Sequence, residues 1–195
     1  LLAGRKILVT GSGTGLGKAM AAKFLSLGAE IHICGRRKGV CEETAAELME
    51  KHGGKVTAHG VDIRDAAAVD TMIESAFRDG PLTDLINNAA GNFISRTQDL
   101  TPRGFDAVAN IVMHGTFYVN QASLQHLLKN KYSSITNMAS TAAIGSHPWM
   151  SAYAAAKGGV ISFTRSLYIE YVKQGLRANS VVGGGIATSL HSDFK

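Results

Sequence analysis

Short apolar runs alternate with longer helix-favouring stretches along the whole chain. The apolar runs predict strands at residues 6–10, 30–34, 55–61, 84–88, 134–138 and 176–182. The stretches between them predict helices at residues 15–27, 40–52, 66–77, 101–129 and 149–173. Strands that alternate with helices of this length are typical of a parallel sheet covered by helices on both faces. We therefore expect an α/β fold, organised as one domain over residues 1–195.

The longest predicted helix, 101–129, carries apolar side chains at near-helical spacing. They are Phe105, Val108, Val112, Phe117 and Leu124. The simplest interpretation is that all of them pack into the core.

Composition narrows the class of protein. Hydrophobic residues make up 45% and charged residues 18% of the 195 residues, which fits a folded α/β protein better than a disordered chain. The formal net charge is +5, but the basic residues are scattered except at Arg36, Arg37 and Lys38. A short basic run of this kind is either a solvated face or a site for a phosphate-bearing small ligand, and we expect no nucleic-acid partner.

Other ligand classes find little support in the sequence. Cys34 and Cys41 are the only cysteines, and the seven histidines show no ligand spacing, so we predict no metal site. Two unpaired thiols favour a reducing compartment: the cytoplasm, the mitochondrial matrix or the peroxisome. No apolar run approaches the roughly 20 residues of a membrane span, and no signal-peptide pattern is present.

Candidate chemistry begins with Tyr153 and Lys157, which are four residues apart in a predicted helix and so share one face. A cation about 4 Å from a phenol, at an effective dielectric near 20, favours the phenolate by roughly 4 kcal/mol. Such a tyrosine could transfer protons near neutral pH. The same spacing also arises by chance on surface helices, so it needs support from the rest of the chain.

That support comes from a glycine-rich loop between the first strand and the first helix. Glycines there let the backbone approach a pyrophosphate, and the helix N-terminus offers free N–H groups and a positive dipole end. The predicted contacts are Gly11, Ser12, Gly13, Thr14, Gly15, Leu16 and Gly17. The loop's position at a strand–helix junction favours dinucleotide binding over an ordinary tight turn.

The order of motifs resembles the short-chain dehydrogenases/reductases from residue 6 to about residue 188. The motifs are the glycine loop, Asn87-Asn88-Ala89, Ser140, and Tyr153 with Lys157. The resemblance implies a Rossmann-type, doubly wound parallel sheet of strand order 3-2-1-4-5-6 in three α/β/α layers. It also implies a nicotinamide cofactor and a homodimer or homotetramer.

The resemblance further implies site residues. It gives a catalytic tetrad of Asn110, Ser140, Tyr153 and Lys157, in which Asn110 holds a water, Ser140 orients a carbonyl, Tyr153 is the acid/base and Lys157 lowers the tyrosine pKa and binds the ribose. Beyond the glycine loop, Tyr153 and Lys157, the expected cofactor contacts are Arg36, Arg37, Asp62, Ile63, Asn88, Ala89, Ala90, Gly184, Ile186 and Thr188.

The end of the second strand predicts which cofactor is preferred. NAD sites place an acidic residue there for the ribose 2′-hydroxyl, whereas an arginine accepts the 2′-phosphate of NADP. This chain has Gly35, Arg36 and Arg37 and no acid. Because an arginine fork pairs with a phosphate through two hydrogen bonds, we expect NADP(H) in preference to NAD(H). The alternative is that both arginines face solvent.

The substrate stays open between two branches of the family. Ala90, Gly91, Asn92 and Phe93 look like the 2,4-dienoyl-CoA reductase branch, and Phe93 could line an acyl pocket or pack in the core. The segment around Tyr153 looks more like carbonyl reductases. We therefore expect an oxidoreductase acting on a carbonyl or alcohol, with dienoyl-CoA reduction as the alternative and a non-catalytic NADP(H)-binding module as the second alternative.

The C-terminal part departs from the family pattern. Gly183 and Gly184 stand where the family usually has Pro-Gly, and the sequence stops at Lys195, before the family's substrate loop and last strand. We expect the sequence to be a fragment of a longer protein.

Overall fold

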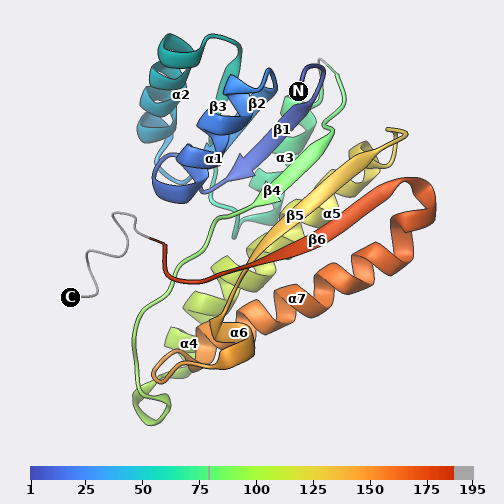
Figure 1. The fold of residues 1–195 in the computed structure, drawn as a ribbon. Coiled ribbons are helices and arrows are strands. Elements are labelled where there is room, and N and C mark those ends of the chain that lie inside the picture. The colour runs from blue at the N-terminus through green and yellow to red at the C-terminus, as the bar shows by residue number, and fades with distance from the viewer. Residues whose placement is uncertain (79, 187–195) are drawn as a thin grey trace.

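A computed structural model describes residues 1–78 and 80–186 and contains, within them, a six-stranded parallel sheet (Figure 1). The elements in chain order are β1 (Lys6–Thr10), α1 (Gly15–Ser26), β2 (Glu30–Gly35), α2 (Lys38–His52), β3 (Val56–Gly60), α3 (Ala66–Ala76), β4 (Asp84–Asn87), η1 (Thr97–Asp99), α4 (Pro102–Ala109), η2 (Asn110–His114), α5 (Gly115–Leu127), β5 (Ser133–Ser140), α6 (Ala142–Gly145), α7 (Ser151–Tyr171), η3 (Val172–Gln174) and β6 (Leu176–Gly183).

The strand order is β3-β2-β1-β4-β5-β6, and every neighbouring pair is parallel. This order confirms the predicted Rossmann-type sheet. The order reverses between β1 and β4, and ligands of open α/β sheets bind at such a point, outside the carboxyl ends of the strands.

Helices cover both faces of the sheet because successive strand residues point to opposite sides. On one face α1 and α2 pack over the first three strands, around Val9, Ile31 and Ile33. On the other face α3, α5 and α7 pack around Leu8 and Ile135 (Figure 1). A smaller apolar cluster joins α4 and η2 to the start of α7.

The predicted 101–129 helix is three segments in succession, because the π-helical η2 separates α4 from α5. Val108 and Val112 are buried as expected. Phe105 and Phe117 are 40% and 46% exposed, so the expectation that both lie in the core is wrong. A short helix that the sequence did not predict, α6, follows β5.

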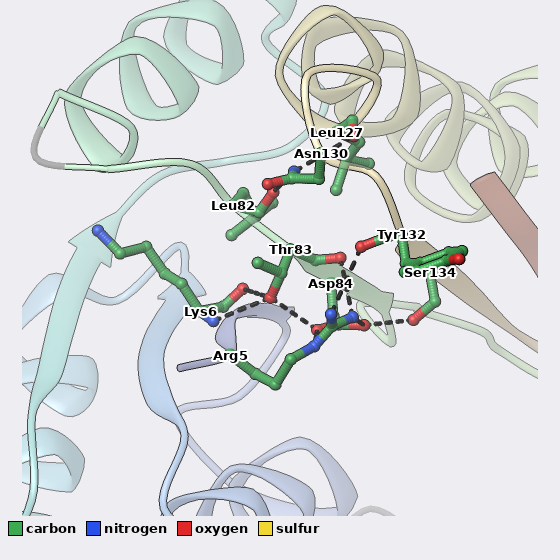
Figure 2. A network of polar contacts seen from close by, with 9 residues as sticks. All are labelled: Arg5, Lys6, Leu82, Thr83, Asp84, Leu127, Asn130, Tyr132 and Ser134. Atoms are coloured by element: carbon green, nitrogen blue, oxygen red, sulfur yellow. Dashed lines mark hydrogen bonds and ion pairs between the residues drawn. The ribbon is translucent and has the colours of Figure 1, made fainter. Parts of the chain in front are cut away.

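A polar network ties the amino ends of β1, β4 and β5 together, at the opposite end of the sheet from their carboxyl termini (Figure 2). Arg5 donates to both carboxylate oxygens of Asp84, over 2.7 and 2.6 Å. The same carboxylate accepts from the hydroxyls of Thr83 and Ser134. Bidentate arginine–carboxylate pairs are geometrically specific, so this network fixes how the three strands begin relative to one another.

Candidate active site

A cavity of about 650 Å³ lies at the carboxyl ends of the strands. Gly11, Gly35, Asn88, Ser140 and Gly183 lie at or just after the ends of β1, β2, β4, β5 and β6, and all five line it. The predicted site residues that line it are Gly11, Gly13, Thr14, Gly15, Leu16, Arg36, Arg37, Ile63, Asn88, Ala89, Ala90, Ser140, Tyr153, Lys157, Gly184 and Ile186. The chain therefore brings the glycine loop and the Tyr153 region to one cavity.

Close backbone packing shapes the glycine loop. Gly11 has a φ of +65°, and a Cβ at this position would lie 2.7 Å from the Cα of Ala89. Asn88 holds the loop from the side, because its amide nitrogen donates to the carbonyls of Thr10 and Gly11 at 3.0 and 3.1 Å. A larger residue at Gly11 would separate the loop from the segment after β4.

The N-terminus of α1 is suited to an anion. Its N-cap residue, Thr14, makes no side-chain capping hydrogen bond, and the first turn holds no acidic residue. Thr14, Gly15 and Leu16 line the cavity. The backbone N–H groups and the positive end of the helix dipole are thus available to the pyrophosphate of a dinucleotide, and the residues present fit that group.

Positive charge lies at the β2 end of the cavity. Arg36 and Arg37 are exposed and line it next to Gly35. The expected adenine contact, Asp62, does not line the cavity. Arg64 donates to both carboxylate oxygens of Asp62, with an Nη2–Oδ2 distance of 2.5 Å, and this hydrogen bonding lowers the Asp62 pKa. The carboxylate that was expected to contact adenine is therefore paired with Arg64.

Ser140, at the end of β5, and Tyr153, on α7, line the same cavity. The nearby Ser140 hydroxyl acts to lower the Tyr153 pKa. Burial has the larger effect, and the net result is a Tyr153 pKa raised above its ordinary value of 10.0. The structure therefore holds a protonated phenol at neutral pH, and differs from the expectation that Lys157 lowers this pKa.

Lys157 is 3% exposed and lies behind Tyr153. Its Nζ is 5.7 Å from the centre of the tyrosine ring and donates to the carbonyl of Met138. Burial lowers the pKa of Lys157 to about 8. The ammonium is thus held by β5 and shares the cavity with Tyr153.

Four other predicted residues do not line the cavity. Ser12 is buried, where its hydroxyl donates to Val9 O and accepts from Cys34 N–H, so it joins β1 to β2. Gly17 packs under Gly11. Asp62 pairs with Arg64, and Asn110 begins η2, with its carbonyl accepting from Gly115 N–H. Thr188 lies outside the described residues.

Several lining residues were missed in the sequence. Ile94, His147 and Met150 face the cavity from the segments after β4 and before α7, while Cys34 and Cys41 face it as buried free thiols near β2. Ile94 could have been predicted from its place in the segment that follows the predicted strand 84–88. Phe93 does not line the cavity; its ring packs against Gly104 of α4.

Residues 1–78 and 80–186 offer neither a metal-ligand cluster nor a membrane-spanning helix. No three or more His, Cys, Asp or Glu side chains come together as metal ligands there. None of the helices in these ranges has the length and apolar character that a membrane crossing requires.

Comparison with known proteins identifies relatives over nearly the whole chain. The sequence model described as short chain dehydrogenase matches residues 5–195. A probable 2,4-dienoyl-CoA reductase of Bacillus subtilis is 41% identical over 93% of this chain and 72% of its own length. Probable 2,4-dienoyl-CoA reductase 3 of Caenorhabditis elegans is 39% identical over 96% of this chain. The chain spans only 62% of that nematode protein.

Relatives with other activities also match. D-beta-hydroxybutyrate dehydrogenase of Cupriavidus necator is 31% identical over 97% of this chain and 74% of its own length. Among solved structures, a citronellol catabolism dehydrogenase of Pseudomonas aeruginosa PAO1 superimposes with a TM-score of 0.90 at 34% identity, over 96% of this chain and 77% of that one. These relatives share one fold and differ in substrate.

Proposed function

Because the chain belongs to the short-chain dehydrogenase family, we propose that it is an NADP(H)-dependent oxidoreductase that transfers hydride between a nicotinamide and a carbonyl or alcohol. One observation carries this proposal. Ser140, Tyr153 and the buried Lys157 line the same cavity as the uncapped N-terminus of α1. The N-terminus of α1 would bind the pyrophosphate of the dinucleotide, and Tyr153 would give a proton to the substrate beside it.

The chain's own residues supply proton transfer and charge stabilisation. The nicotinamide, when bound, supplies the hydride. Tyr153 is the proton donor in reduction, because its phenol is protonated at neutral pH. Ser140 donates a hydrogen bond to the substrate oxygen on which negative charge develops. Lys157 binds the ribose and keeps a positive charge near the phenol; Asn110 stays a proposed water-holding residue.

The activity is tested by following NADPH oxidation with ethyl acetoacetate, an aldehyde and 2,4-hexadienoyl-CoA. Tyr153→Phe should lower turnover by about 10²- to 10⁴-fold, the usual contribution of a general acid, while NADPH affinity is retained. Tyr168→Phe, on the exposed part of α7, is the matched control and should keep full turnover. Equal turnover in the two variants would refute the role of Tyr153.

Preference for NADP(H) is supported by Arg36 and Arg37 beside Gly35, with no carboxylate at that strand end. A hydrogen bond to a charged group contributes about 1.5–3 kcal/mol, so Arg36→Ala should weaken NADPH binding roughly 10- to 100-fold. NADH binding should change little. Arg103→Ala, on α4, is a charge-matched control. If the unaltered chain binds NADH as tightly as NADPH, the preference is wrong.

Dienoyl-CoA reduction is the second candidate, favoured by the names of the B. subtilis and C. elegans relatives and by Asn92, which lines the cavity after β4. The same assay separates the candidates, because only one substrate class should support NADPH oxidation. If neither does while NADPH binds, a non-catalytic NADP(H)-binding module becomes the better interpretation.

A homodimer or homotetramer in a reducing compartment is also proposed. Exposed apolar side chains on the outer helices support association: Phe105 on α4, Phe117 on α5 and Ile169 on α7. Light scattering of the purified protein tests the state, and a monomer at micromolar concentration would count against it.

A further inference from the structure

Two loops at the mouth of the cavity are joined to each other. The first runs from Asn92 to Arg96, between β4 and η1, and the second from Ser146 to Met150, before α7. Thr97 is the first residue of η1 and Ser151 the first residue of α7. The backbone N–H of Ser95 donates to the carbonyl of Trp149 over 3.0 Å. The hydroxyl of Thr97 donates to that of Ser151 over 3.1 Å. We call this pair of hydrogen bonds the clasp.

The second loop has an unusual backbone. Ser146 and Trp149, with φ of +55° and +67°, are the non-glycine residues with positive φ among those described. A bulky side chain such as tryptophan rarely takes this conformation, and such outliers gather where a site needs a particular backbone direction. The strained residue at Trp149 is the one whose carbonyl accepts from Ser95.

The clasp joins two segments that line the cavity. Ile94 lies next to Ser95, and His147 and Met150 flank Pro148 and Trp149; all three line the cavity that holds Ser140 and Tyr153. Tyr153 follows Trp149 by four residues and lies in the first turn of α7. The first loop is in turn anchored on α4, where the Phe93 ring lies 3.1 Å from the place of a Gly104 Cβ.

We propose that Trp149 is a positioning residue: its left-handed backbone directs its carbonyl to Ser95, so that the clasp holds Ile94 and Met150 as a fixed wall for the substrate opposite Tyr153. This proposal rests on the proposed function. It assigns the role to the backbone of Trp149 and the two hydrogen bonds, not to the indole ring.

Two substitutions at Trp149 distinguish the effect of its backbone conformation from the effect of its indole ring. Trp149→Gly and Trp149→Val both remove the ring, but glycine adopts positive φ freely and valine does not. The Val variant should show a KM about tenfold higher than the Gly variant, with kcat within about threefold, for the substrate that the unaltered chain turns over, ethyl acetoacetate or 2,4-hexadienoyl-CoA. NADPH affinity should be equal in both. Equal KM values in the two variants would overturn the proposal.

A second measurement does not depend on activity or on the Val variant folding. Trp149 is the single tryptophan of the chain, so its fluorescence reports on this loop alone. Thr97→Val removes the hydroxyl and should increase acrylamide quenching of Trp149, whereas Thr97→Ser keeps the hydroxyl and should leave quenching unchanged. Ser95→Pro, which lacks the N–H, should act like Thr97→Val, with Ser95→Ala as its control.

Unchanged quenching in Thr97→Val and Ser95→Pro overturns the clasp whether or not a substrate is found. If quenching rises as expected but no substrate is reduced, the clasp stands as a structural feature, the proposed function fails, and the positioning role fails with it.

Discussion

Gly17 lies where the first turn of α1 passes beneath the backbone of Gly11. A Cβ at Gly17 would lie 2.4 Å from Gly11 O and 2.7 Å from the amide nitrogen of Asn88. Neither neighbour is the free end of a flexible side chain, because the Asn88 amide is held by two hydrogen bonds. The glycine is therefore required by close packing, although it does not line the cavity.

Gly17→Ala should lower the free energy of unfolding by about 1–3 kcal/mol, as expected for overpacking. It should also weaken NADPH binding, because the glycine loop has to move. Gly158→Ala is the matched control: it lies in α7 with no atom within 4 Å of the added methyl, and alanine is favoured over glycine in helices by about 1 kcal/mol. Urea denaturation measures both, and opposite signs are expected.

The meeting of α5 with the loop after β3 shows how elements shape the site. Gly115 begins α5 directly after η2, and a Cβ there would lie 2.7 Å from Cδ1 and Cγ1 of Ile63. Ile63 is buried and lines the cavity. The glycine thus lets the helix approach closely enough for Ile63 to form part of the cavity wall.

Gly115→Ala should destabilise the fold by about 1–3 kcal/mol through this collision. Ile63→Ala alone should cost about 2–5 kcal/mol. The double variant should cost less than the sum by about 0.5–3 kcal/mol, because removing the isoleucine makes room for the alanine. Additive losses in denaturant melts would show that the two residues do not compete for the same space.

Part of this architecture could be read from the sequence. Apolar runs and helical stretches predict the sheet. The glycine loop and the Tyr153–Lys157 spacing predict site residues that the structure brings to one cavity. The π-helical η2 could not be predicted, because helical periodicity does not register a local change of hydrogen bonding. The left-handed backbone conformation of Trp149 could not be predicted either. Tryptophan has no preference for that conformation, and tertiary contacts impose it. The ion pair between Asp62 and Arg64 was also not predicted, because the family pattern gives Asp62 a cofactor contact and does not consider the arginine two positions away.

At the scale of the whole molecule, a histidine pair on neighbouring strands, one buried and one half-buried, links stability to pH. His32 on β2 and His59 on β3 are 2.9 Å apart, Nδ1 to Nε2, with stacked rings. Burial first, then the charges of His59 and Lys6, lowers the His32 pKa to about 4; Glu30 acts in the opposite direction. Burial also lowers the pKa of His59. Both imidazoles are therefore neutral in the folded protein at neutral pH.

Stability should fall as the pH drops from about 6.5 towards 4. In that window the unfolded chain binds a proton at His32 and the folded chain does not, so acid favours unfolding by up to about 1.4 kcal/mol per pH unit for one group. His32→Gln removes this titration and should flatten the slope. Unfolding free energies from urea melts at pH 7, 6 and 5 provide the measurement, and an unchanged slope in the variant would contradict the assignment.

The Arg5–Asp84 pair joins the amino ends of β1 and β4, whereas the cavity lies at the carboxyl ends of the strands. The loops that line the cavity therefore take no part in this network. Laboratory selection for new substrates could therefore exchange residues 92–97 and 146–151 together, as one cassette, without loosening the scaffold beneath them.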